Sequence, residues 1–329
     1  MIQVEHLTKC YGDVMAVRDL SFEIDEGHVY GFLGPNGAGK STTMNIMTGC
    51  LSATSGRVLI DGHDIFEEPK EAKRLMGYLP EQPPLYLGES PVEYLTFVGR
   101  AKGLKGEELK HQVTDVMAQT KIEHVAHRRI GDLSKGYRQR VGIAQALLGN
   151  PKVIILDEPT VGLDPIQIIE IRDLIRELGR THTVIFSSHI LSEVQAICDR
   201  ILIIAHGKLV AFDCPENLER DLLTQNQITL TTQAGPDEVQ EVLDRLDHLS
   251  DITFQAKEGG YTQTHFHTSH PKPYEMTRQL FWAFAESDVP LLEMTLKKAS
   301  LEDVFLELTE TAPAQEDEAE EMDEEVEEA

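Results

Sequence analysis

The residues whose types and spacing best suit chemistry lie in the segment GPNGAGKST, residues 34–42. It fits the pattern G-x-x-x-x-G-K-[ST] at every fixed position, and its glycines let the backbone curl around an anion and point N–H groups at it. Lys40 can reach the β- and γ-phosphates of a nucleotide, and the Ser41 hydroxyl can bind the Mg²⁺ that bridges them. The segment predicts a phosphate-binding loop made of Gly34, Pro35, Asn36, Gly37, Ala38, Gly39, Lys40, Ser41 and Thr42.

The residues around this loop support the prediction. Residues 29–33, VYGFL, form a short apolar run typical of a buried parallel strand, and the residues after the loop have helical spacing. A helix at that position directs the positive end of its dipole at a bound phosphate. A glycine-rich turn that matched by chance would lack both elements, so we favour phosphate binding.

A second group of chemical residues ends the segment KVIILDEPT, residues 152–160. Four apolar residues, 153–156, suit a strand covered on both faces, and Asp157 and Glu158 follow it. Because neighbouring strand residues point to opposite faces, the two carboxylates have different tasks. We expect Asp157 to reach the Mg²⁺ shell and Glu158 to orient or deprotonate an attacking water. An acidic turn after a strand is the alternative, and the loop upstream makes it the weaker one.

His189 follows another apolar run, residues 183–186. A single histidine is more often structural than catalytic. This one leaves the predicted sheet at the carboxyl edge, where the phosphate-binding loop and the acids also lie and where parallel sheets bind ligands. We therefore predict that His189 senses the γ-phosphate, in an α/β fold built on a parallel sheet.

The overall charge limits the classes of partner. The chain has 329 residues, enough for two domains, and a net charge of −26. Ten acidic residues lie between Glu316 and Glu328; without them 46 acidic and 30 basic residues remain, a net charge of −16. An acidic body argues against a nucleic-acid partner held by a broad basic face.

Cysteine spacing and hydropathy point to a reduced protein that does not insert itself in a membrane. Cys10, Cys50, Cys198 and Cys214 are far apart, which suggests neither a disulfide framework nor a zinc site. The N-terminus lacks the layout of a signal peptide, and no apolar run approaches the ~18 residues of a membrane helix. If the protein works at a membrane, a partner must hold it there.

Over roughly residues 1–220 the chain resembles the nucleotide-binding subunit of ATP-binding cassette (ABC) transporters. GPNGAGKST is similar to the Walker A motif, VIILDEP to Walker B, LSKGYRQ to the signature motif, GLD to the D-loop and Ser188-His189 to the H-loop. The resemblance implies a P-loop NTPase domain with a helical insertion, with ATP and Mg²⁺ as cofactors and ATP hydrolysis as the activity. Tyr11 matches the aromatic residue that stacks on adenine, whereas position alone leaves open a loop aromatic packed on the sheet edge.

The resemblance also implies roles for residues outside the phosphate-binding loop. Ser134 and Gly136 of the signature motif approach the γ-phosphate bound by a second subunit, and Asp164 belongs to the nucleotide site. Lys40, Glu158 and His189 serve hydrolysis. Two ATP molecules join two subunits, and a homodimer is workable because the motifs are intact.

Two motifs depart from the commonest family pattern. The signature has Lys135 and Tyr137 where glycine and glutamine are usual, although Ser134 and Gly136 are kept. In the Q-loop segment GYLPEQPPLY, Glu81 aligns with the usual glutamine and Gln82 follows it, so either residue can be the one that senses Mg²⁺ and the attacking water. The predicted metal ligands are therefore Ser41, Asp157 and Gln82, with Glu81 open.

These variations resemble the branch whose permeases are of the ABC-2 type, often exporters, and SLEDVFLELT at 300–309 resembles the end of that branch's ATPases. The resemblance implies an integral membrane permease as partner, a second ATPase subunit and a place on the cytoplasmic face of the cell membrane. The main alternative is a soluble ABC ATPase acting on ribosomes or DNA. A regulatory module with negligible turnover is a third hypothesis, which intact Glu158 and His189 disfavour.

We expect three parts in the chain. Residues 1–222 form the ATPase domain, with a helical subdomain at about 88–135. Residues 226–310 form a small α+β domain whose order of strand, helix, strand, strand, helix and strand suggests a ferredoxin-like arrangement. Its His265, His267 and His270 suggest a solvated strand face more than a metal site, because no carboxylate or cysteine completes a ligand set nearby. Residues 311–329 form an acidic tail that we expect to be disordered.

Overall fold

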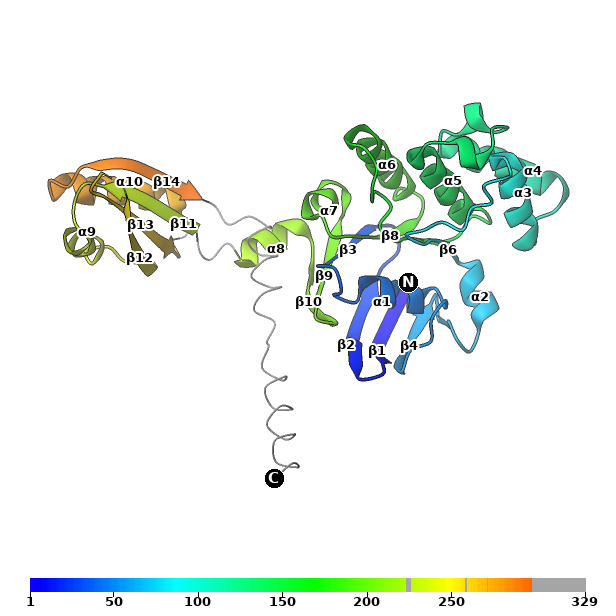
Figure 1. The fold of residues 1–329 in the computed structure, drawn as a ribbon. Helices are drawn as coiled ribbons and strands as arrows, with labels where there is room; N and C mark the ends of the chain where they lie inside the picture. The colour runs from blue at the N-terminus through cyan, green and yellow to red at the C-terminus, as the bar shows by residue number, and fades with distance from the viewer. Residues whose placement is uncertain (223–225, 258, 271, 298–329) are drawn as a thin grey trace, which may run out of the picture. The chain divides into compact units, whose positions relative to one another are not determined.

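The computed structural model describes residues 1–222, 226–257, 259–270 and 272–297, which form two compact units (Figure 1). The first unit includes Met1–Pro215, and the second begins at Glu216. The segment at 300–309 and the predicted acidic tail lie outside the described residues. In the part that the structure describes, no helix combines the length and apolarity needed to cross a membrane.

A six-stranded sheet forms the centre of the first unit, in the order β10-β9-β3-β8-β7-β6. Neighbouring strands from β9 to β6 are parallel, and β9 and β10 form an antiparallel hairpin. Every residue of β3, β7 and β8 is buried, which confirms the strands predicted from continuous apolar runs. The strands are β3 (Val29–Leu33), β6 (Met76–Leu79), β7 (Val153–Leu156), β8 (Thr183–Ser188), β9 (Arg200–Ala205) and β10 (Lys208–Asp213).

A smaller antiparallel sheet, in the order β2-β1-β4-β5, shares a hydrophobic core with the central sheet. Ile2 and Leu20 of this sheet belong to the same buried cluster as Met44 of α1 (Lys40–Met47) and Phe32 and Ile155 of the central sheet. This core anchors the helix that begins at the phosphate-binding loop. The remaining elements are β1 (Ile2–Tyr11), β2 (Val14–Ile24), β4 (Ser55–Ile60), β5 (His63–Asp64) and α2 (Pro69–Arg74).

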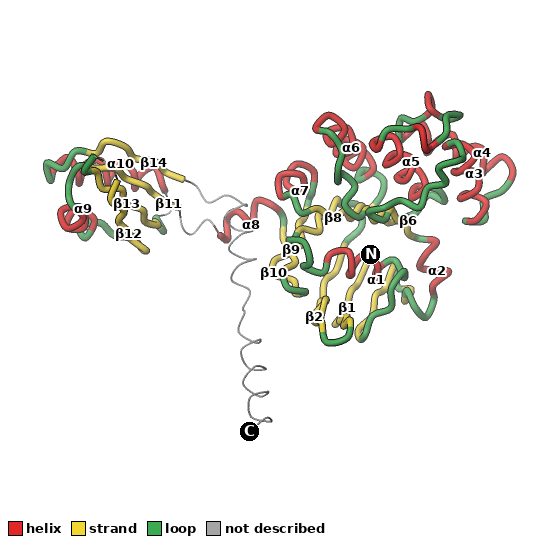
Figure 2. The backbone as a smooth tube through the Cα atoms, in the orientation of Figure 1, coloured by secondary structure: helices red, strands yellow, loops and turns green. Residues whose placement is uncertain are grey.

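Three helices, α3 (Pro91–Ala101), α4 (Gly106–Gln119) and α5 (Lys135–Leu147), pack together beyond β6 (Figure 2). Short 3₁₀ turns at Glu123–Val125 and Ile130–Asp132 connect α4 to α5. Ser90 and Glu93 form a capping box that fixes the start of α3. At the other end of α3, the Lys102 ammonium donates to the carbonyl oxygen of Leu148 at 2.6 Å. Leu148 lies just past the end of α5.

Helix α6 (Pro165–Leu178) begins after Asp164, which caps it by accepting the N–H groups of Ile166 and Gln167 at 3.0 Å. α7 (Leu191–Ile197) follows β8, and α8 (Pro215–Leu222) follows β10.

The second unit has the element order expected from the sequence. Its sheet has the order β12-β13-β11-β14 with all neighbours antiparallel, the pairing that a ferredoxin-like arrangement requires. Ile228, Phe266, Leu280 and Phe284 contribute to its separate core. The elements are β11 (Asn226–Thr232), α9 (Pro236–Leu243), β12 (Leu249–Lys257), β13 (Tyr261–Thr268), α10 (Pro273–Glu286) and β14 (Leu291–Lys297).

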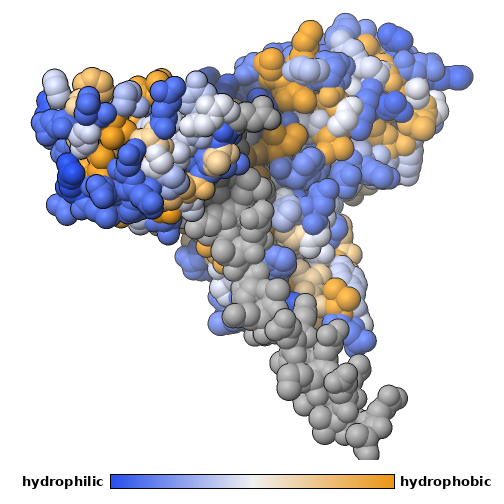
Figure 3. Space-filling view, turned by 60° about the vertical axis from the view of Figure 1, so that its left-hand side comes forward, coloured by the Kyte–Doolittle hydropathy of each residue, from blue (hydrophilic) through white to orange (hydrophobic). Residues whose placement is uncertain are grey.

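The histidines of this unit make local polar contacts. The ring of His265 lies 3.0 Å from the Thr229 hydroxyl, and the ring of His267 lies 3.4 Å from Asp251. His270 lies against His248, with ring centroids 5.5 Å apart. On the face drawn in the space-filling view, most side chains are hydrophilic, and smaller hydrophobic patches are scattered among them (Figure 3).

Candidate functional site

The predicted catalytic residues meet at one edge of the central sheet. β3, β6, β7 and β8 run parallel, so the loops that leave their carboxyl ends lie side by side. These loops surround a pocket of about 340 Å³, called the phosphate pocket below. It is lined by Ala16, Asn36, Gly37, Gly39, Lys40, Ser41, Thr42, Glu81, Glu158, Val161 and His189.

The phosphate-binding loop needs its glycines for steric reasons. Gly39 has φ +100°, and a Cβ on it would lie 2.5 Å from the carbonyl oxygen of Ala16. A Cβ on Gly34 would lie 2.3 Å from the carbonyl oxygen of Ile204. Side chains at these positions would force the loop away from its neighbours, so the tight curve depends on glycine.

Lys40 is held inside this loop with only 6% of its surface exposed. Its ammonium donates to the carbonyl oxygens of Gly34 at 2.8 Å and Pro35 at 3.2 Å, and lies 3.7 Å from Glu158 Oε1. Burial lowers the pKa of Lys40, an effect that the carboxylates of Glu158 and Asp157 partly offset. The structure thus provides a fixed cation at the pocket where phosphate charge would lie.

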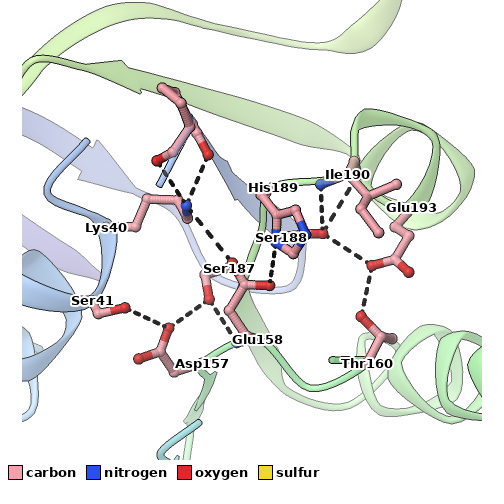
Figure 4. A network of polar contacts seen from close by, with 12 residues as sticks. Lys40, Ser41, Asp157, Glu158, Thr160, Ser187, Ser188, His189, Ile190 and Glu193 are labelled. Atoms are coloured by element: carbon pink, nitrogen blue, oxygen red, sulfur yellow. Dashed lines mark hydrogen bonds and ion pairs between the residues drawn. The ribbon is translucent and has the colours of Figure 1, made fainter. Parts of the chain in front are cut away.

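The Ser41 hydroxyl, in the lining of the phosphate pocket, and the Asp157 carboxylate form a candidate Mg²⁺ site (Figure 4). The Ser41 hydroxyl donates to Asp157 Oδ1 at 3.3 Å. Both groups are hard oxygen ligands of the kind that Mg²⁺ prefers, so these residues fit the predicted ion. Ser187 donates to the same Asp157 oxygen at 2.6 Å and accepts the N–H of Glu158 at 2.7 Å. Ser187 therefore positions both carboxylate residues.

Glu158 has an uncommon backbone conformation, with φ 48°. Left-handed backbone at a non-glycine residue is unfavourable and persists where surrounding contacts hold it. Here those contacts are the Ser187 hydroxyl on the backbone, Lys40 beside Oε1, and the His189 ring 3.1 Å from Oε2. The carboxylate is thereby fixed between a cation and an imidazole, as expected for a group that orients or deprotonates water.

A buried carboxylate behind the pocket joins the two catalytic loops (Figure 4). Glu193 Oε2 accepts the Thr160 hydroxyl at 2.7 Å and the Ser188 hydroxyl at 3.0 Å, and Arg172 lies 3.7 Å from Oε1. Thr160 follows the loop of Glu158, and Ser188 precedes His189. Sequence reasoning missed Ser187, Thr160 and Glu193; the available signal was polar side chains within or next to strongly apolar segments.

Glu81 and Gln82 differ in their position relative to the phosphate pocket. Glu81 lines the phosphate pocket and contributes an electrostatic effect on the pKa of Lys40, whereas Gln82 does not line the pocket. Tyr11, at the end of β1, also does not line it; its ring is half exposed, and the Lys9 ammonium lies 5.2 Å from the ring centroid.

The signature residues line a different pocket in the same unit. Ser134, Gly136 and Asp164 contribute to a pocket of about 270 Å³, called the signature pocket below, which shares no lining residue with the phosphate pocket. Ser134 caps α5 by accepting the N–H of Tyr137 at 3.4 Å. Gly136 lies against α6, because a Cβ there would lie 2.7 Å from the side chain of Gln167. Within one chain, the signature residues are therefore not brought to the phosphate-binding loop.

Comparison with known proteins identifies relatives over nearly the whole chain. Residues 17–161 match the family model described as ABC transporter. An uncharacterized ABC transporter ATP-binding protein of Bacillus subtilis is 37% identical, covering 94% of this chain and 96% of the relative. The bacitracin transport ATP-binding protein of Bacillus licheniformis is 34% identical (94% and 97%), and the linearmycin resistance ATP-binding protein of B. subtilis is 33% identical (94% and 98%).

Solved structures are similar over about two thirds of the chain. The structure of an ATP-binding subunit of an ABC transporter is similar with a TM-score of 0.61 and 29% identity, over 68% of this chain and 93% of that one. A dimeric ATP-binding cassette in a post-hydrolysis state, bound to ADP and phosphate, has a TM-score of 0.59 and 27% identity, over 65% of this chain and 98% of that one.

Proposed function

This chain belongs to the ATP-binding subunits of ABC transporters, and from that premise we propose how its residues bind and hydrolyse ATP to energise transport. The activity is that of an ATPase coupled to transport. The observation that carries the residue assignments is the meeting of Lys40, Ser41, Glu158 and His189 around one pocket at the carboxyl edge of a parallel sheet.

The phosphates of ATP bind in the phosphate-binding loop. Backbone N–H groups of residues 36–42 and the positive end of α1 face the β- and γ-phosphates, and the Lys40 ammonium neutralises part of their charge. Ser41 and Asp157 would hold Mg²⁺, which would supply positive charge to stabilise the negative charge that develops in phosphoryl transfer. Tyr11 stacks on the adenine ring once the nucleotide brings the two together.

Hydrolysis uses the carboxylate of Glu158. It accepts a proton from a water molecule while the water oxygen forms a bond to the γ-phosphorus and the bond to the bridging β,γ-oxygen breaks, giving ADP and phosphate. The His189 ring, 3.1 Å from Glu158 Oε2, orients that carboxylate and contacts the γ-phosphate of bound ATP. Glu81, as a lining residue, is placed to contact the attacking water.

Two subunits complete each site. Because the signature pocket is separate from the phosphate pocket, Ser134, Gly136 and the N-terminus of α5 act on ATP bound by a second copy. The dimeric solved relative supports this arrangement. ATP then joins the subunits, and hydrolysis lets them separate.

The permease binds next to the Q-loop segment. Tyr86, Leu87 and Phe97 are each slightly more than half exposed, and the rings of Tyr86 and Phe97 lie 5.4 Å apart. An exposed apolar cluster of this kind is typical of a protein contact. With relatives named for bacitracin transport and linearmycin resistance, we propose an ABC-2-type exporter, with this subunit at the cytoplasmic membrane face.

One experiment tests these assignments together. The tagged chain is purified from detergent-solubilised membranes of its native cell, its partners are identified by mass spectrometry, and ATP turnover is measured in the complex. We expect a membrane protein with several spans as the main partner. A Tyr86→Ser, Phe97→Ser double variant should no longer bind this protein. Phe66→Ser, which changes another exposed aromatic residue, is the control and should still bind it. Ribosomal or DNA-bound partners without a membrane protein would contradict the transporter assignment.

A further inference from the structure

A groove between α3 and α4 has no role in the function described above. Its volume is about 750 Å³. The floor is apolar, formed by the buried side chains of Leu104, Leu109 and Val113, together with Val92. The remaining lining residues are Thr96, Arg100, Lys105, Gly106, Lys110 and Thr114. The exposed cluster of Tyr86, Leu87 and Phe97 shares no residue with it, so a permease on that cluster leaves the groove lining unassigned.

The charge of this groove is opposite to that of the protein. The chain has 56 acidic and 30 basic residues, yet Arg100, Lys105 and Lys110 are the charged residues of the lining. Among the residues that the structure describes, neither Arg100 nor Lys105 has an ion-pair partner. Lys110 lies 2.7 Å from Glu107 in an exposed pair, which is a weak interaction. The groove thus offers an apolar floor with available cations at its rim, which suits an anionic segment with apolar side chains.

The C-terminal segment of this chain has both properties. Residues 316–329 contain ten acidic residues and no basic one. Their apolar residues, Ala319, Met322, Val326 and Ala329, recur at intervals of three, four and three, the spacing that aligns side chains on one helical face. The remaining positions are acidic. Bound along the groove, such a stripe would contact the floor while the carboxylates meet the cationic rim.

We propose that residues 316–329 dock into the groove between α3 and α4. The segment belongs to the same chain, so the effective concentration of a tethered partner favours even a weak contact. Residues 298–315 lie between the last described strand and the segment, and at about 3.4 Å per extended residue they span up to roughly 60 Å. The contact weakens at high salt, because it depends on the exposed cations at the rim of the groove, which salt screens.

Carbodiimide coupling of the full-length protein tests this contact, since the reagent joins a lysine amine to a carboxylate that touches it. At low salt we expect Lys105 and Lys110 to couple to residues 316–328 at least five-fold more than the exposed Lys70 and Lys208, as measured by mass spectrometry of digested protein. Coupling should fall to the level of those control lysines at 0.5 M salt.

Two pairs of variants distinguish docking from simple charge attraction. Met322→Asp with Val326→Asp removes the apolar stripe but adds acidic charge, so coupling at Lys105 and Lys110 should fall at least three-fold. Ala312→Asp with Ala314→Asp adds the same charge outside the stripe and should leave coupling unchanged. Arg100→Gln should reduce it at least two-fold, whereas Arg180→Gln, an exposed arginine elsewhere, should not.

Several results would overturn the proposal. Coupling spread evenly over exposed lysines would show that the segment has no fixed site. Unchanged coupling in the Met322→Asp, Val326→Asp variant would reduce the contact to charge attraction. In the detergent-extracted complex, coupling of Lys105 and Lys110 to another protein in place of this segment would make the groove a partner's site.

Discussion

The phosphate pocket and the signature pocket lie in the same unit, yet they differ in how much of their chemistry is already satisfied. In the first, Glu158 contacts both Lys40 and His189, and Lys40 and Glu158 are buried. In the second, the hydrogen bonds that the Ser134 and Asp164 side chains make within the described part of the chain are those that cap their own helices. The phosphate pocket is internally organised by contacts among its own side chains, whereas the signature pocket presents the N-terminus of α5.

This difference indicates where each kind of change should act. A substitution in the phosphate pocket should impair ATP binding or hydrolysis within the subunit that carries it, without the involvement of a second subunit. A substitution in the signature pocket should leave nucleotide binding by the single subunit intact and damage only what two copies do together.

Lys40→Ala should have the largest effect. It removes the buried cation 3.7 Å from Glu158, and loss of one preorganised charge-stabilising group costs about 10²–10³ in kcat. We expect ATP turnover to fall by at least that factor, with weaker ATP binding by calorimetry. Lys70→Ala, an exposed lysine on α2, is the control and should keep normal turnover. Normal activity in Lys40→Ala would remove the phosphate-binding assignment.

Glu158→Gln should separate binding from hydrolysis within the phosphate pocket. The amide keeps the shape of the side chain but cannot accept the proton, and general-base catalysis is worth about 10²–10⁴. Turnover should fall within that range while ATP still binds and the dimer persists, as measured by light scattering after gel filtration. Glu177→Gln, on exposed α6 surface, is the matched control. A variant that stays monomeric with ATP would count against the two-subunit mechanism.

Gly136→Asp tests the signature pocket. It adds a carboxylate where a second copy's γ-phosphate is expected, so ATP-dependent dimerisation should be lost and turnover should fall about 10²-fold, the scale of one lost charge-stabilising contact. ATP affinity of the single subunit should change less than about two-fold, because the two pockets share no residue. Gly88→Asp, where a Cβ would meet nothing within 4 Å, is the control. Equal loss of ATP affinity would erase the distinction between the pockets.

Thr160→Val tests whether the hydrogen bond between Thr160 and Glu193, outside the lining of the phosphate pocket, contributes to kcat. The isosteric change removes the hydroxyl that donates to Glu193 at 2.7 Å, which frees the loop after Glu158. We expect kcat to fall about ten-fold with little change in KM, because a buried hydrogen bond to a charged group is worth about 1.5–3 kcal/mol. Thr181→Val, at an exposed position, should have no effect. A change in KM alone would indicate that Thr160 contributes to ATP binding and not to the hydrolysis step.

The Q-loop pair should give the smallest effect. Glu81→Ala removes a pocket-lining carboxylate and should lower kcat several-fold, whereas Gln82→Ala should stay within about two-fold, because Gln82 does not line the pocket. Steady-state turnover of the two variants side by side decides between them. A larger loss for Gln82 would assign the sensor role to Gln82 once ATP is bound.

The parts that the sequence predicted are those whose chemistry is local. The glycines and lysine of the phosphate-binding loop, the apolar strands and the carboxylates after residue 156 depend on neighbouring residues, and the structure has these elements where the patterns indicate. The roles of Ser187 and Glu193 were missed, because they come from contacts with residues 29 and 33 positions away in the chain, and a polar residue beside an apolar segment does not by itself reveal its partner. The choice between Glu81 and Gln82 depends on the course of a proline-rich loop that no periodicity describes.

The hydrogen bond from Lys102 to the carbonyl oxygen of Leu148 has a mechanical consequence. α5 has 13 residues, a length of about 20 Å, and Ser134 lies at its opposite end. Lys102 lies at the C-terminal end of α3, the helix that begins soon after the Q-loop segment. The hydrogen bond therefore connects the C-terminal ends of α3 and α5. Because α3 and α5 also pack against each other, a permease that displaces α3 would move α5 with it and shift Ser134 at the opposite end of α5.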